Sequence, residues 1–128
     1  MAETRSLRVL VVGNEASTRE MLARDLESLG HAVTQAEDGT SGVEAAKVEP
    51  VPELVILDLT MDLKGGDMVM EEIRADVRTA AVPAIFCSMP GYATVRRKLG
   101  ERPRITLHKP FRLEQLKNAV AAAMADIP

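Results

Sequence analysis

Leu54-Val55-Ile56-Leu57-Asp58 is the stretch that decides the fold, because four consecutive branched apolar residues run directly into a carboxylate. A short run that is apolar on both faces is typical of a strand covered on both sides of a parallel sheet. Comparable runs occupy residues 7–12, 32–36, 84–87 and 105–108. We therefore predict five strands, with the strand that ends before Asp58 in the centre of the sheet.

Helical patterns alternate with these runs. Residues 17–20, Ser-Thr-Arg-Glu, resemble a capping box that begins a helix, and an apolar stripe then leads to Gly30, a typical helix end. Further helical patterns cover residues 41–47, 67–76, 93–99 and 113–124. Five strands alternating with five helices predict an α/β domain whose parallel sheet is joined by right-handed crossovers.

The bulk composition predicts one soluble domain without a disulfide. The chain has 128 residues, of which 46% are apolar and 27% charged, as in an ordinary globular domain. Its apolar runs are too short to cross a membrane, its first residues lack a signal-peptide core, and Cys87 is the only cysteine. We expect a single cytoplasmic domain over residues 1–128, with its core at about 7–124 and no contact with membrane.

The charges are distributed unevenly along the chain. Residues 1–88 hold 8 basic and 16 acidic side chains, whereas residues 89–128 hold 8 basic and 3 acidic ones. The net charge of −3 and the lack of interleaved aromatic residues argue against nucleic acid as a partner of this domain. The basic excess is either a solvated surface or a docking face for an acidic partner. This basic cluster comprises Arg96, Arg97, Lys98, Arg102 and Arg104, with Arg112 and Lys117 nearby.

Reactive side chains follow several of the predicted strands. In a parallel sheet the site lies outside the carboxyl ends of the strands, which directs attention to residues 13–15, Asp58, Ser88 and Lys109. An Asp carboxylate can attack a phosphoryl group, a Lys ammonium can neutralise its charge, and a Ser hydroxyl can donate a hydrogen bond. The competing interpretation is a plain salt bridge between Asp58 and Lys109.

Four motifs give the chain a resemblance to the receiver domains of response regulators. They are Val11-Val12, the run from Leu54 to Leu59 that contains Asp58, Val82-Pro83-Ala84-Ile85 to Ser88, and Lys109-Pro110-Phe111. Each motif is weak alone, but their order and spacing are specific, and the resemblance covers about residues 7–123. It implies a flavodoxin-like (βα)5 three-layer sandwich with strand order 2-1-3-4-5.

The resemblance also implies a role for individual residues. Asp58 would be the phospho-acceptor, and Lys109, Ser88 and Thr60 would contact the phosphate. Thr60 would also offer its backbone carbonyl to Mg²⁺. Ser88 and Thr106 occupy the positions of the activation switch, although Thr106 replaces the usual aromatic residue. Met89 stands where receivers usually have a small residue, so it is expected to cover Asp58 in part.

The metal-binding positions depart most clearly from the family pattern. Most receivers have two acidic residues directly after the first strand, whereas this chain has Gly13 and Asn14. Mg²⁺ prefers charged oxygen ligands in near-octahedral geometry. We predict a degraded metal site formed by Asp58, Asn14 and Thr60, with weak or absent Mg²⁺ binding. Replacement of the lost ligands by Glu15 or Asp62 remains an open alternative.

Three functional hypotheses follow. The favoured one is a signalling module, not an enzyme, which acts by contact with a histidine kinase or another signalling protein after Asp58 phosphorylation has weakened or been lost. Its contact face, including a homodimer interface, would be the fourth helix, fifth strand and fifth helix. The alternative is a conventional receiver phosphorylated on Asp58 by a histidine kinase. A flavin-binding protein or aspartate-nucleophile hydrolase is disfavoured, because aromatic residues are few and neither His31 nor His108 is obviously placed as a general acid or base.

Overall fold

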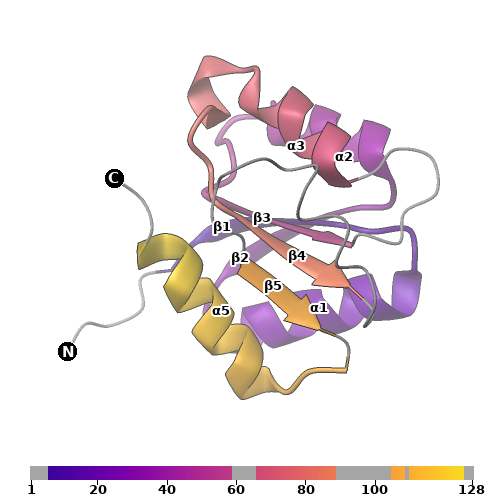
Figure 1. Cartoon of the computed structure of the whole chain (residues 1–128), viewed down its shortest axis with the longest axis vertical. Coiled ribbons are helices and arrows are strands. Elements are labelled where there is room, and N and C mark those ends of the chain that lie inside the picture. Colours follow the sequence, from indigo (N-terminus) through magenta and orange to yellow (C-terminus); the bar gives the residue numbers. More distant parts are fainter. Residues whose placement is uncertain (1–5, 59–65, 89–104, 109, 126–128) are drawn as a thin grey trace.

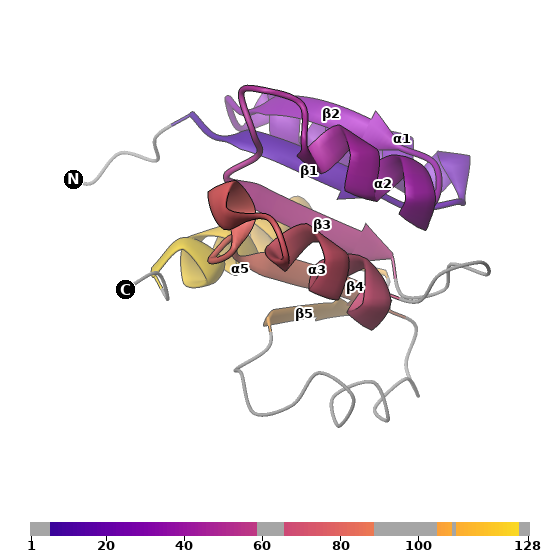
Figure 2. The same cartoon turned by 90° about the horizontal axis from the view of Figure 1, so that it is seen from above.

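The computed structural model describes residues 6–58, 66–88, 105–108 and 110–125. Five parallel strands form one sheet in the order β2-β1-β3-β4-β5, which confirms the predicted topology. Their bounds are Arg8–Val12 (β1), Ala32–Ala36 (β2), Leu54–Asp58 (β3), Ala84–Ser88 (β4) and Ile105–His108 (β5). Every strand pairing is parallel, so the carboxyl ends of the strands share one edge of the sheet, to which the β2 and β3 arrows point in Figure 2.

Helices cover both faces of the sheet, giving the expected three layers (Figure 1). Helices α1 (Ala16–Ser28) and α5 (Leu113–Ala125) lie on one face, and α2 (Gly39–Ala46) and α3 (Gly66–Arg74) lie on the other. A short 3₁₀ turn, Val77–Thr79, follows α3. The helix predicted over residues 93–99 lies outside the described residues. No helix in the described part of the chain has the length and hydropathy needed to span a membrane.

Strand β3 is the centre of the molecule, as its continuous apolar run predicted. Leu54 and Ile56 pack into the core between the sheet and the α1/α5 layer, while Val55 and Leu57 pack into the core on the α2/α3 side. All four side chains are 0% exposed. Successive side chains of a strand point to opposite faces, so one strand anchors both layers and holds the following carboxylate rigidly.

The predicted capping box at the start of α1 is wrong. The helix begins at Ala16, and its N-cap residue is Glu15 in an extended conformation without a side-chain cap, so Ser17 already lies inside the first turn. A hydroxyl caps a helix only from the extended residue that precedes it, a place that Ser17 does not have. The other end of α1 agrees with the prediction, because Gly30 has a positive φ of 98° directly after the C-cap residue Leu29.

Local hydrogen bonds account for the shifted bounds of α2 and α3. Helix α2 begins two residues earlier than predicted, because the Asp38 carboxylate accepts a hydrogen bond from the backbone N–H of Ser41 at 2.8 Å. Helix α3 ends at Arg74 instead of continuing to residue 76. Asp76 there caps the 3₁₀ turn by accepting a hydrogen bond from the backbone N–H of Arg78 at 2.9 Å.

His31 is a structural residue at the end of the sheet opposite to the carboxyl edge. The backbone N–H of Leu7 donates a hydrogen bond to its Nδ1 at 3.1 Å, and the ring is 5% exposed. Burial lowers the pKa of His31 below its ordinary value. A strand rises about 3.3 Å per residue, so the contact with Leu7 lies about 20 Å from Gly13, beyond the far end of β1. This position agrees with the expectation that His31 is not a catalytic acid or base.

Candidate functional site

Asp58 is the last residue of β3 and lies at the carboxyl edge of the sheet. Its side chain is 3% exposed, and in the sheet register it pairs with Cys87 of the neighbouring strand β4. Alternation along β3 places Asp58 on the same side as Leu54 and Ile56, above the core under α1 and α5. A buried carboxylate at a strand end is unusual in a purely structural role, because burial of a charge is costly. Asp58 is therefore the centre of the candidate site.

Gly13 lies directly beside Asp58. Val12 pairs with Leu57 in the sheet register, and each of these residues is followed by a site residue, Gly13 and Asp58. A Cβ atom built on Gly13 would lie 3.0 Å from the Cβ of Asp58 and 3.5 Å from its Oδ2. The structure thus brings together two residues that the sequence placed at the same site. Asn14, the next residue, is exposed at the same edge.

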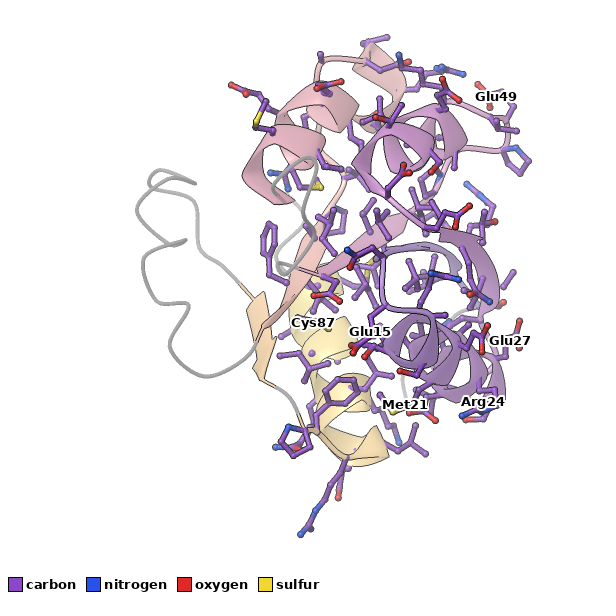
Figure 3. All side chains as sticks on the ribbon, turned by 90° about the vertical axis from the view of Figure 1, so that its right-hand side faces the viewer. Glu15, Met21, Arg24, Glu27, Glu49 and Cys87 are labelled. Carbon is purple, nitrogen blue, oxygen red and sulfur yellow. The ribbon has the colours of Figure 1, made fainter. Side chains whose placement is uncertain are left out.

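Glu15 has a defined role at the start of α1. It is the N-cap residue, and its carboxylate accepts a hydrogen bond from the hydroxyl of Thr18 in the first turn. Figure 3 looks onto the carboxyl edge and shows Glu15 and Cys87 near the centre of the view, with Arg24 and Glu27 further out along α1. A negative charge at this position also interacts favourably with the N-terminus of the helix.

Arg19 is a site residue that the sequence analysis missed. Its Nη1 donates a hydrogen bond to the carbonyl oxygen of Gly13 at 2.8 Å, and its Nε donates to Oε1 of Gln35 on β2 at 3.1 Å. The guanidinium thus joins α1, β2 and the residue that follows β1. The only signal in the sequence is that Arg19 lies one helical turn beyond Glu15, which does not by itself indicate a contact across the loop.

Asp38 is a second acidic residue that follows a strand, but it is occupied locally. Its Oδ1 accepts hydrogen bonds from the backbone N–H and the hydroxyl of Ser41, at 2.8 Å and 2.6 Å. The hydrogen bond from the Ser41 hydroxyl, with that from the backbone, lowers the pKa of Asp38 below its ordinary value. This carboxylate is therefore used to begin α2.

The chain matches the family model of the response regulator receiver domain over residues 9–121. It belongs to that family. Protein PilH of Pseudomonas aeruginosa is 30% identical over 121 residues, which cover 92% of this chain and 98% of PilH. The DNA-binding dual master transcriptional regulator RpaA of Synechocystis is 29% identical over 118 residues, which cover 91% of this chain and 48% of that protein. The receiver domain thus spans about half the length of RpaA.

Solved receiver structures have the same fold. The chemotaxis protein CheY4 of Vibrio cholerae aligns with a TM-score of 0.82 at 22% identity, covering 93% of this chain and 99% of that protein. The receiver domain of the sensor histidine kinase PA1611 of P. aeruginosa, solved with a magnesium ion in its active-site cleft, aligns with a TM-score of 0.82 at 22% identity. That alignment covers 95% of this chain and all of that domain. At such identities the likeness establishes the fold alone.

Several residues predicted for the receiver site are not placed. Lys109, Thr60, Asp62 and Met89 lie outside the described residues, as do the members of the basic cluster from Arg96 to Arg104. Ser88 is the last residue of β4 and Thr106 lies on β5. Of these two residues the structure describes the backbone. Phe111 is partly buried and packs against the core beside α5. Arg112 and Lys117 are exposed at the start of α5.

The described residues fit Mg²⁺ poorly. No group of three His, Cys, Asp or Glu side chains suited to a metal ion occurs in the parts of the chain that the structure describes. Gly13 contributes no side chain beside Asp58, and Asn14 offers a neutral amide where Mg²⁺ favours a carboxylate. A buried carboxylate is thus present at the edge of the sheet, and Gly13 and Asn14 after β1 supply no negative charge for a cation.

Proposed function

We propose that this receiver domain transmits a signal by protein contact, as a signalling module and not an enzyme, and that Mg²⁺-dependent phosphorylation of Asp58 is weakened or lost. The observation that carries the proposal is the pair Gly13 and Asn14 next to Asp58, one without a side chain and one with a neutral side chain. The favoured hypothesis from the sequence is therefore kept.

The size of the missing attraction supports this proposal. A carboxylate about 4 Å from a cation contributes about 4 kcal/mol per unit charge at an effective dielectric of about 20, before desolvation is counted. Phosphoryl transfer depends mainly on positioning and on stabilising the charge of the phosphoryl oxygens. A site that lacks two such carboxylates holds its cation weakly, and its aspartyl phosphate forms slowly.

The neighbouring acids are poor replacements for the lost ligands. Glu15 is placed at the N-cap of α1, where its carboxylate accepts a hydrogen bond from Thr18. Asp38 accepts two hydrogen bonds from Ser41 at the start of α2. Both carboxylates are therefore already used at the starts of helices.

For the partner, we propose a histidine kinase or another signalling protein that offers an acidic surface. Arg112 and Lys117 are exposed on the α5 side, and the rest of the basic cluster precedes them in the sequence. Complementary charges would speed association and select the partner. A symmetric homodimer through the same face would bring these like charges together, which favours a different, acidic protein.

A conventional receiver, phosphorylated on Asp58 by a histidine kinase, is the second candidate. It is supported by the buried position of Asp58 at the end of β3 and by membership of the family. The two candidates differ in one measurable property, which is the ability of Asp58 to accept a phosphoryl group when Mg²⁺ is present.

The test is intact-protein mass spectrometry after incubation with acetyl phosphate and Mg²⁺. The wild-type domain and its Asp58→Asn variant are compared, and a receiver with both acidic residues is treated in parallel as the positive control. We expect the wild-type protein to gain little or no phosphoryl mass while the control is modified. Stoichiometric modification that disappears in Asp58→Asn would establish the conventional receiver and refute the proposal.

A further inference from the structure

The backbone at Gly13 is held in place from two sides. Its N–H donates a hydrogen bond to the carbonyl of Ala36 on β2 at 3.0 Å, and its carbonyl accepts one from Arg19 on α1 at 2.8 Å. Gly13 is buried, and it follows β1 without an intervening residue. These hydrogen bonds fix Gly13 to β2 and α1, so the end of β1 keeps them only if it moves away from β3 together with those two elements.

The Cβ atom of Asp58 is also held in place. The nearest contact of a Cβ atom at residue 13 would be the Cβ of Asp58 at 3.0 Å, an atom bonded directly to the β3 backbone. Strand β3 pairs with β1 on one side and with β4 on the other. Closely packed interiors tolerate little added volume, so relief of this contact would require the two strands to separate by a few tenths of an ångström.

From this geometry we infer that Gly13 is a steric determinant of the acceptor site, because the end of β1 lies so close to Asp58 that any side chain at the first metal-ligand position would be strained. The inference rests on the proposed function, because it explains why one substitution would not restore the metal site. Asn14 is exposed and under no such constraint. The two lost ligand positions therefore differ, since only the second can accept a carboxylate without this strain.

The substitution Gly13→Ala tests the contact through the sign of its effect on stability. Gly13 does not have a positive φ, so alanine meets no backbone penalty there. At such a site alanine normally stabilises a protein, raising the folding equilibrium constant about two- to fivefold, because it restricts the unfolded chain. We expect the opposite, a fall of about fivefold or more in the folding equilibrium constant measured by urea unfolding, because the new methyl group would overpack against Asp58.

Combining Gly13→Ala with each of two substitutions at residue 58 identifies the atom that the new methyl group contacts. Asp58→Ala keeps the Cβ of residue 58 and should preserve the loss caused by Gly13→Ala, whereas Asp58→Gly removes that Cβ and should abolish the loss. Equal losses in both backgrounds, or a gain of stability in the wild-type background, would overturn the inference. If the Asp58→Gly protein does not fold, the sign measured in the wild-type background decides.

Titration with Mg²⁺ tests the functional consequence. We expect Asn14→Asp to raise the affinity for Mg²⁺ by about tenfold or more, because it adds one carboxylate near the acceptor. Gly13→Asp alone should give a smaller rise together with a loss of stability. A Gly13→Asp protein that keeps wild-type stability and binds Mg²⁺ as tightly as Asn14→Asp would contradict the inference. Tight Mg²⁺ binding by the wild-type protein would instead refute the proposed function, while the Gly13→Ala measurement would still decide the steric inference.

Discussion

His31 makes the stability of this domain depend on pH, and the substitution His31→Asn should remove that dependence. The ring is 5% exposed, and its Nδ1 accepts the hydrogen bond from the backbone N–H of Leu7 at 3.1 Å. The Oδ1 of asparagine can occupy the place of Nδ1 and accept the same hydrogen bond, but the amide does not titrate. The variant therefore keeps the acceptor and loses only the protonation.

The sign and the limit of the effect follow from proton linkage. Burial lowers the pKa of His31 in the folded protein below the value of 6.5 expected for the unfolded chain. The resulting stability is fully present above about pH 6.5 and is lost as the pH falls towards the folded pKa, because the unfolded state then binds the extra proton. One group contributes at most about 1.4 kcal/mol per pH unit.

The assay is urea unfolding monitored by circular dichroism at about pH 7.5 and about pH 5.5. We expect the wild-type protein to lose up to about 1.4 kcal/mol more than the His31→Asn protein between these conditions. The matched control His31→Leu leaves the N–H of Leu7 without its acceptor and should cost about 1–3 kcal/mol at both pH values. Parallel pH profiles for the wild-type and His31→Asn proteins would refute the reasoning.

Three further predictions concern packing, the loop after β1 and a surface ion pair. Leu116→Ala should lower the free energy of unfolding by about 2–5 kcal/mol, because the side chain is 0% exposed, whereas Leu113→Ala at 44% exposure should change it by less than about 0.5 kcal/mol in the same urea titration. Arg19→Met keeps most of the aliphatic stem but removes the hydrogen bonds to Gly13 and Gln35; we expect a loss of about 1 kcal/mol and faster exchange of the Gly13 amide, and unchanged exchange would count against the role of Arg19. The hydrogen bonds from Arg78 hold the pKa of Asp76 at about 2, below its usual 3.8, so an NMR titration should show Arg78→Gln returning it towards 3.8; stability from this pair is present above pH 3.8 and is lost as the pH falls towards 2.

The fold was largely predictable because its signals are local. All five strands lie where the apolar runs occur, and β1 ends at Val12 as predicted, whereas the N-cap of α1 lies two residues before the predicted one. The errors lie at the ends of helices, at the starts of α1 and α2 and at the early end of α3 at Arg74. Asp38 moved the start of α2, and the preference of the chain for Glu15 as N-cap displaced the expected role of Ser17.

The sequence placed Asp58 and Gly13 at one edge of the sheet, but it did not predict the contacts around them. Asp58 and Gly13 were expected at one edge because parallel strands end together, and the structure places them there. Arg19 was not expected, since its hydrogen bonds join α1 to β2 and to the residue after β1, and such pairings leave no periodic trace in the sequence. The same holds for the acceptor role of His31 towards Leu7.

Pattern alone was enough to define the alternation of strands and helices along the chain and the carboxylate at the end of the central strand, because hydrophobic periodicity is a property of short segments. It also showed that Gly13 and Asn14 bring no negative charge to the metal positions. The folded arrangement was needed to show that Gly13 lies against Asp58, so that a Cβ atom at residue 13 would be strained. The distance between Gly13 and Asp58 depends on the spacing of β1 and β3, two strands far apart in sequence. The packing of both cores and the hydrogen bonds that hold the end of β1 set this spacing.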